Sequence, residues 1–88
     1  MIGAAVYDAA YVLAEYLERH PELVNGNRVL ELGAGPGLVG IVAGLLGAEK
    51  VIVTDGDETV VELAQRNIDD VEKKVDFAGS VSAKRLLW

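Results

Sequence analysis

The chain has 88 residues, which is enough for one small domain and leaves no room for a second. It carries 8 Lys and Arg against 14 Asp and Glu, a net charge of −6, whereas a nucleic-acid-binding domain needs a basic surface. The absence of cysteine excludes disulfides and thiolate metal sites, and an apolar content of 51% argues against a disordered chain.

No secretory signal or membrane-spanning segment is expected. The first residues lack a positively charged n-region, and the apolar run over residues 38–48 is much shorter than the roughly 20 residues needed to cross a bilayer. The single histidine, His20, precedes Pro21, where a solvated surface residue is expected, so no metal site is predicted. We therefore expect a soluble, cytoplasmic protein that binds neither nucleic acid nor membranes.

The first half of the chain predicts a helix, a strand and a glycine-rich loop. Apolar residues recur at three- and four-residue steps over residues 4–19, which is typical of an amphipathic helix. Pro21 ends it, because proline disfavours helical geometry in the preceding residue. Residues 25–27 (Asn-Gly-Asn) are a turn signal, residues 28–32 (RVLEL) predict a largely buried strand, and residues 33–37 form the loop.

The next two elements predict a buried helix and a buried strand. Residues 38–46 have helical length and are apolar nearly all round, so this helix should be covered on most faces. Gly47 suits the position just after the helix end. Residues 50–54 (KVIVT) are rich in β-branched side chains, which predicts a second buried strand.

A third helix and a third strand complete the predicted order. Asp57 can cap a helix over residues 58–70. One side of that helix carries Val60, Ala64, Asn67, Ile68 and Val71. Residues 75–78 and 81–87 are both candidate strands, and the second is favoured. Strands that alternate with helices imply a parallel sheet, so we predict an α/β, three-layer Rossmann-like half-domain with three parallel strands in the order 3-2-1, preceded by an N-terminal helix.

The loop between the first strand and the second helix is the main functional signal. Alternating glycines at Gly33, Gly35 and Gly37 allow a sharp turn and a close approach of a ligand to the main chain. Helix N–H groups just beyond them favour an anionic or polar group. Asp55 ends the next strand, where an acid can accept hydrogen bonds from both ribose hydroxyls. Together these features indicate an adenosine-containing ligand.

Glu31 separates the two cofactors that fit this pattern. It lies two residues before the first glycine, where it would repel the pyrophosphate of NAD. The same carboxylate suits the ammonium group and the sulfonium centre of S-adenosylmethionine. We therefore favour S-adenosylmethionine and keep an NAD-type dinucleotide-binding module as the alternative. A Glu31 carboxylate satisfied by nearby backbone N–H groups is the purely structural interpretation.

Residues 29–37 resemble motif I of the class I, seven-strand methyltransferases. Residues 6–10 (VYDAA), the Thr54-Asp55 strand end, Arg66-Asn67-Ile68 and the terminal Leu-Leu-Trp resemble the protein-lysine methyltransferase group in particular. That group typically has tryptophan where this chain has Tyr7. The similarity covers most of residues 4–70 and the tail, whereas residues 71–80 align poorly.

The resemblance implies a role for individual residues. Glu31 and the loop backbone would hold the methionine part of S-adenosylmethionine, Asp55 would bind the ribose, and further cofactor contacts would come from the turn after Asp55 and from both ends of the chain. The implied cofactor-binding residues are Glu31, Gly33, Ala34, Gly35, Gly37, Asp55, Gly56, Asp57, Trp88 and Tyr7. No catalytic residue can be nominated.

The resemblance also implies an incomplete enzyme. The family's four further strands and its substrate-contacting loops have no counterpart in residues 1–88, so we expect a single truncated cofactor-binding domain with weak or absent turnover. Its acceptor could be a protein. The free edge of strand 28–32 predicts a homo-oligomer, an exchanged segment or a completing chain. A non-catalytic or engineered self-associating fragment of this fold remains a third possibility.

Overall fold

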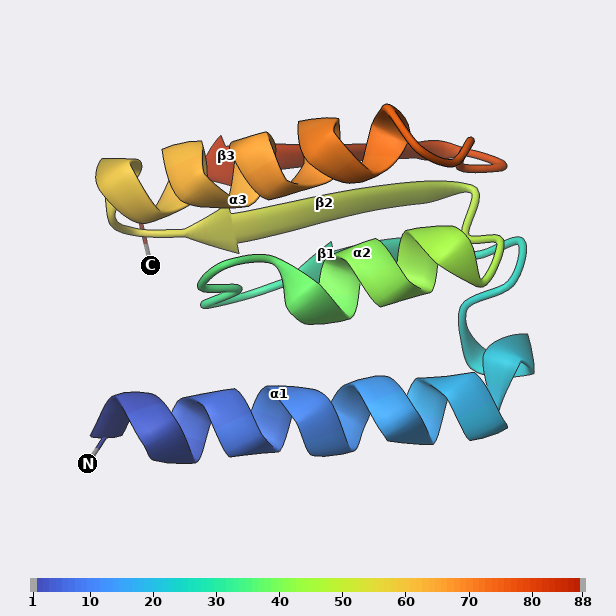
Figure 1. Cartoon of the computed structure of the whole chain (residues 1–88), viewed down its shortest axis with the longest axis horizontal. Coiled ribbons are helices and arrows are strands. Elements are labelled where there is room, and N and C mark those ends of the chain that lie inside the picture. Colours follow the sequence, from blue (N-terminus) through green and yellow to red (C-terminus); the bar gives the residue numbers. More distant parts are fainter. Residues whose placement is uncertain (1, 88) are drawn as a thin grey trace.

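The structure, a computed structural model, describes residues 2–87, with side chains from residue 9 onward. Helices and strands alternate along the chain, and α1 lies beside α2 rather than over the sheet (Figure 1). The elements are α1 (Ile2–Arg19), the 3-10 helix η1 (Pro21–Leu23), β1 (Arg28–Glu31), α2 (Leu38–Leu45), β2 (Lys50–Asp55), α3 (Glu58–Glu72) and β3 (Ser80–Arg85).

The three strands form one parallel sheet in the order β1-β2-β3, which confirms the predicted direction and order. Val29 pairs with Val51, which pairs in turn with Val81, so these three side chains share one face. Right-handed crossovers that step in the same direction along a sheet place their helices on the same side. Both α2 and α3 therefore cover this valine face, and residues 2–87 make two layers where the sequence analysis expected three (Figure 1).

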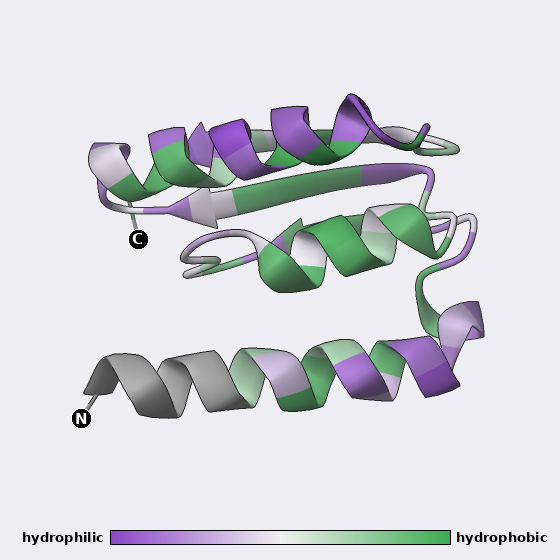
Figure 2. Ribbon diagram, in the orientation of Figure 1, coloured by the Kyte–Doolittle hydropathy of each residue, from purple (hydrophilic) through white to green (hydrophobic). Residues whose placement is uncertain are grey.

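The core lies between the sheet and α2 and α3. Val51, Val53 and Ile68 have no solvent-exposed side-chain surface. In Figure 2 the apolar parts of β2 and α2 face each other, whereas the outer turns of α3 are hydrophilic. Within residues 2–87, no helix is both long enough and apolar enough to cross a membrane.

Close approach between α2 and the sheet depends on Gly40 and Gly44. A Cβ atom at Gly40 would overlap the side chain of Val53, and one at Gly44 would overlap that of Val81. Packing at this distance removes water from the whole valine face and brings the start of α2 directly above the end of β1. These glycines, in the middle of a predicted helix, are therefore packing residues.

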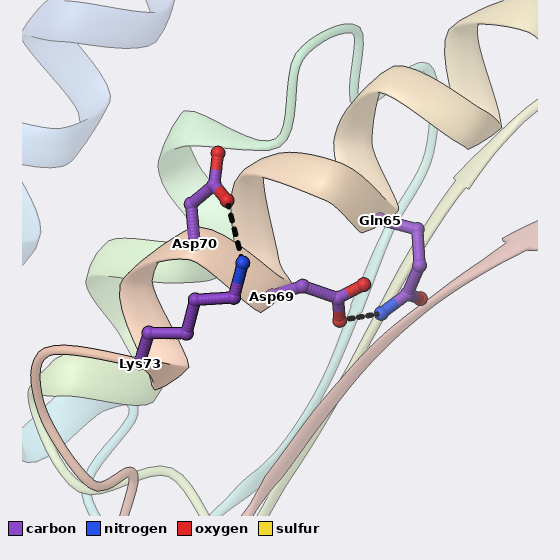
Figure 3. Close-up of polar contacts among 4 residues, drawn as sticks. All are labelled: Gln65, Asp69, Asp70 and Lys73. Carbon is purple, nitrogen blue, oxygen red and sulfur yellow. Dashed lines mark hydrogen bonds and ion pairs between the residues drawn. The ribbon is translucent and has the colours of Figure 1, made fainter.

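Polar contacts join α3 to the sheet and also link side chains on the exposed side of α3. The Gln65 side chain accepts a hydrogen bond from the Ala83 N–H of β3 at 2.9 Å and donates one to Asp69 at 2.9 Å. Figure 3 shows the Gln65–Asp69 contact together with the exposed ion pair between Lys73 and Asp70, at 3.7 Å. Gln65 thus links α3 to β3 by a side-chain hydrogen bond.

The opposite face of the sheet has no helix over it within residues 2–87. Leu30 is 61% exposed there, and Ile52 of the next strand is half-buried. A shallow hollow of about 290 Å³ lies on this side of β1 and β2, with Arg28 and Lys50 at its rim. Parallel sheets are normally covered on both faces, so this surface and the β1 edge are open for further packing.

The observed element ends differ from the expected ones by a few residues. Strand β1 stops at Glu31 because residues 32–37 already turn away, whereas β2 continues to Asp55. The second of the two candidate segments is the third strand, Ser80–Arg85. Pro21 also begins the short helix η1, which the sequence pattern did not predict, because proline suits the first position of a helix as well as ending the one before it. Gly47, with φ +96°, follows the end of α2 as predicted.

We predict that Gly40→Ala destabilises the chain by about 1–3 kcal/mol, because the added methyl group overlaps Val53 in a packed core. Gly56→Ala is the matched control, since its backbone does not require glycine and the nearest atom, on Leu87, would lie 3.7 Å from the new Cβ. Its effect should stay within about 0.5 kcal/mol. Urea unfolding of both variants measures the difference, and equal stabilities would contradict the packing role of Gly40.

Candidate cofactor-binding site

The loop between β1 and α2 adopts a conformation that needs glycine. Gly33, Gly35 and Gly37 have φ angles of +63°, +57° and +91°, in the left-handed region that other residues rarely adopt. No atom lies within 4 Å of a Cβ built on Gly33 or Gly35, so the space in front of both is open. A side chain at Gly37 would touch Ala64 of α3. The loop is therefore curved, packed on one side and accessible on the other.

Three side chains from outside the loop hold it in place. The Thr54 hydroxyl donates to the Glu31 carbonyl at 2.6 Å, and the Thr54 carbonyl accepts from the Ala34 N–H at 2.8 Å. The Asn67 amide of α3 donates to the Pro36 carbonyl at 2.9 Å. A carboxylate oxygen of Asp55 accepts from the Gly35 N–H at 3.3 Å. The loop is thus attached to β2 and α3 as well as to its own flanking elements.

Sequence reasoning did not assign a role to Thr54 or Asn67, although each carries a recognisable signal. Thr54 is a polar residue at the end of an otherwise apolar strand, and it is only 3% exposed. Asn67 is the one polar residue among those that the sequence analysis placed on the inner side of α3, and its side chain is half-buried. A buried polar side chain must have a hydrogen-bond partner, and in both cases that partner belongs to the glycine loop or its entrance.

Glu31, the last residue of β1, lies at the junction of the loop and α2. Its Oε1 accepts a hydrogen bond from the Gly40 N–H at 3.1 Å. Within residues 2–87 this is the one hydrogen bond to the carboxylate, so Oε2 keeps its capacity to accept. Burial raises the pKa of the Glu31 carboxyl above its ordinary value, and the Gly40 hydrogen bond opposes part of that rise. The Gly40 N–H thus occupies Oε1 of Glu31, and Oε2 remains as a partly desolvated hydrogen-bond acceptor beside the loop.

A pocket of about 460 Å³ opens beside Glu31, between α1, the loop and the first residues of α2. This volume lies in the range of small-molecule sites. The lining residues are Ala9, Ala10, Leu13, Glu31, Gly33, Ala34, Gly35, Pro36, Leu38 and Val39. Among the described side chains that line it, Glu31 is the one charged group and the others are apolar. Such a pocket suits a ligand with an aliphatic part and a positive charge.

The turn after β2 borders the loop and lies outside the lining of this pocket. Asp55 is half-buried and accepts from the Asp57 N–H at 3.1 Å with its other oxygen. Asp57 accepts from the Thr59 N–H at 2.9 Å, which confirms the predicted cap of α3. The Gly56 carbonyl accepts from the Arg85 side chain at 3.1 Å. Each carboxylate oxygen of Asp55 therefore has one backbone partner and retains a free lone pair.

Five of the ten residues predicted to bind a cofactor lie in or directly beside the pocket. Glu31, Gly33, Ala34 and Gly35 line the pocket, and Asp55 adjoins them through its contact with Gly35. The others differ in position. Gly37 is buried under α3, Gly56 and Asp57 follow Asp55 in the turn, and the Tyr7 side chain and Trp88 lie outside the described residues.

A sequence model of a family described as lysine methyltransferase matches residues 1–88. The chain belongs to this lysine methyltransferase family. The protein N-lysine methyltransferase METTL21A of Xenopus tropicalis is 46% identical over 87 residues, which cover 99% of this chain and 39% of that protein. The protein N-terminal and lysine N-methyltransferase EFM7 of Gibberella zeae is 36% identical over 88 residues, covering 94% of this chain and 33% of that protein.

The fold has counterparts among solved methyltransferases. A chain of the Trypanosoma brucei PRMT1 enzyme-prozyme complex with AdoHcy superposes on 86% of this chain with a TM-score of 0.73 and 25% identity, and the match covers 22% of that chain. The present chain spans between a third and two fifths of the length of the two sequence relatives, METTL21A and EFM7. Membership of the family and the Rossmann-like fold of the resembled class are both confirmed.

We predict that Glu31→Gln stabilises the folded chain at pH 8 and that the gain shrinks as the pH falls to 5. Glutamine can still accept the Gly40 hydrogen bond, but it removes a desolvated charge. Because the folded-state pKa of Glu31 is raised, its contribution to stability is greatest below the unfolded-state pKa and is lost as the pH rises through the folded-state pKa.

Urea unfolding across this pH range gives the comparison. The exposed Glu62→Gln variant serves as the control, with an expected effect within about 0.5 kcal/mol throughout. A Glu31→Gln variant less stable than the wild type at pH 8, or a difference that does not change with pH, would contradict desolvation of Glu31.

Proposed function

We propose that this chain binds S-adenosylmethionine through the glycine loop, Glu31 and Asp55, as the cofactor-binding part of a protein-lysine methyltransferase. The observation that carries the proposal is the Glu31 carboxylate, with one oxygen free to accept, in the lining of a pocket whose other described side chains are apolar. It lies directly beside a glycine loop with open space in front of it. Membership of the lysine methyltransferase family supports the same cofactor.

The charges of the site match the methionine part of this cofactor. Its ammonium group and sulfonium centre are positive, and the free Oε2 of Glu31 would attract them in a desolvated setting. Its carboxylate is negative and would be attracted to the N-terminus of α2, whose first two residues, Leu38 and Val39, line the same pocket. The aliphatic methylene groups would pack on Ala10 and Leu13 of α1.

Asp55 would hold the ribose. Its two oxygens already fix the loop and the turn through Gly35 and Asp57, and each retains a lone pair for a ribose hydroxyl. Gly56 and Asp57 would then lie near the adenine, and Tyr7 and Trp88 remain proposed contacts. An NAD-type ligand fits less well, because its pyrophosphate would approach the Glu31 carboxylate.

The proposed reaction transfers a methyl group to a lysine amine of a protein acceptor. S-adenosylmethionine supplies a methyl carbon on a positively charged sulfur, which is displaced in line by a neutral amine. Glu31, the loop and Asp55 would orient the donor. No side chain of residues 9–87 offers itself as a base for the acceptor amine, so we propose that this chain alone turns over weakly or not at all. A cytoplasmic location and the absence of nucleic-acid partners stay predictions.

Calorimetric titration of the purified chain with S-adenosylhomocysteine, with NAD in parallel, tests the cofactor. We predict saturable binding of the first and weaker or no binding of the second. Asp55→Ala should weaken binding by roughly tenfold or more, since hydrogen bonds to a charged group contribute about 1.5–3 kcal/mol. Exposed Asp76→Ala is the control and should bind like the wild type. No heat with S-adenosylhomocysteine, or preference for NAD, would contradict the proposal.

We further propose that the β1 edge and the open sheet face are covered by a second copy of the chain, an exchanged segment or a completing chain. Leu30 and Leu32 are 61% and 52% exposed beside the unpaired edge. Sedimentation of the isolated chain should therefore show self-association that rises with concentration. Leu30→Lys should shift the chain toward monomer, since an edge lysine opposes strand pairing. A wild-type chain that stays monomeric at high concentration would count against self-association.

A further inference from the structure

Thr54 is a buried polar side chain in the core of the described residues. It is 3% exposed, and its position in β2 is one residue beyond Val53, the last β2 residue paired with β1. Its hydroxyl donates to the Glu31 carbonyl at 2.6 Å. A buried hydroxyl costs free energy unless it is paired, so this contact is specific and not incidental.

The same residue also holds the far side of the turn. The Thr54 carbonyl accepts from the Ala34 N–H at 2.8 Å. Between Glu31 and Ala34 the chain reverses through Gly33, whose φ is +63°. One residue of β2 therefore fixes the backbone just before and just after this reversal, once through its side chain and once through its main chain.

The atoms held by Thr54 are direct neighbours of the groups that the proposed function requires. The fixed carbonyl belongs to Glu31, whose carboxylate lines the pocket. The fixed N–H belongs to Ala34, and the next N–H, of Gly35, points to Asp55 at 3.3 Å. Loss of the hydroxyl would leave the Glu31 carbonyl without this partner and free the loop to adopt other conformations.

We propose that Thr54 is a positioning residue for cofactor binding: its hydroxyl holds the glycine loop in the conformation that presents the Glu31 carboxylate and the Gly35 backbone to the ligand. This rests on the proposed function, since Thr54 itself does not line the pocket. If only a fraction of the molecules has the loop in the binding-competent conformation, the apparent Kd equals the intrinsic Kd divided by that fraction. The hydroxyl acts by keeping that fraction high.

Two substitutions separate the hydroxyl from the methyl group of Thr54. Thr54→Val keeps the size and the β-branching and removes the hydroxyl, whereas Thr54→Ser keeps the hydroxyl and removes the methyl group. The other threonine of the chain, exposed Thr59, provides the matched control Thr59→Val. If Thr54 only filled space, the valine variant would bind as well as the wild type and the serine variant would be the poorer one.

The experiment combines calorimetric titration with S-adenosylhomocysteine and amide hydrogen exchange in the ligand-free chain. Thr54→Val should raise the Kd about five- to thirtyfold and speed exchange at Ala34 and Gly35, with core amides such as that of Ile68 unchanged. Thr54→Ser should stay within about threefold of the wild-type Kd even where it lowers the urea midpoint. Thr59→Val should match the wild type in both measurements.

The outcomes distinguish the positioning role from the proposed function. Wild-type affinity in Thr54→Val, or equal weakening in the serine and valine variants, would overturn the positioning role. If the wild type does not bind S-adenosylhomocysteine, the proposed function fails, and positioning for that ligand fails with it. Hydrogen exchange would then still test whether the Thr54 hydroxyl holds the loop in one conformation. Unchanged protection at Ala34 and Gly35 in Thr54→Val would overturn that role as well.

Discussion

The close packing of α2 on β1 and β2 is the constraint on which the rest of the structure depends. Gly40 has no side chain, so the helix lies against Val53, and its first turn stands over the end of β1. Glu31 can then accept the Gly40 N–H. Because the chain has only residues 32–37 in which to leave the strand and enter the helix, it reverses through three glycines in the left-handed region.

This geometry also produces the candidate site. Packing α2 onto the sheet removes water from around Glu31, which raises its pKa and strengthens its attraction for a positive group. The curved loop exposes backbone on the side where Gly33 and Gly35 have open space. Thr54, Asp55 and Asn67 hold the other side. Asp55 therefore both stabilises the loop and is proposed to bind the cofactor, whereas Thr54 and Asn67 act on the loop alone.

The sequence predicted the elements and their order well, because periodicity, proline and glycine signals are local. The alternation of strand and helix gave the parallel sheet, and the cap at Asp57 followed from its position before α3. The number of helix layers could not be predicted from these local signals. It depends on whether successive strand–helix–strand crossovers proceed in the same direction along the sheet. Residues 2–87 place both α2 and α3 on one face.

Only part of the candidate site could be predicted from the sequence, because some of its contacts join residues that are far apart in the chain. Glu31, the glycines and Asp55 stand next to strand ends, where spacing alone suggests a ligand. Thr54 and Asn67 act across the fold, on Glu31 and on Pro36, and no local pattern shows such pairings. The other predicted contacts, from the Tyr7 side chain and from Trp88, lie outside the described part of the chain.

We propose that the glycine loop, together with Glu31 and Asp55, forms the cofactor-binding surface of the chain. Titration of the ¹⁵N-labelled chain with S-adenosylhomocysteine, followed through its backbone N–H resonances, tests it most directly. We predict saturable shifts at Gly33, Gly35, Leu38 and Asp55, with little change at Gly26 at the opposite end of the sheet. Absence of saturable shifts, or shifts confined to residues away from the loop, would contradict it.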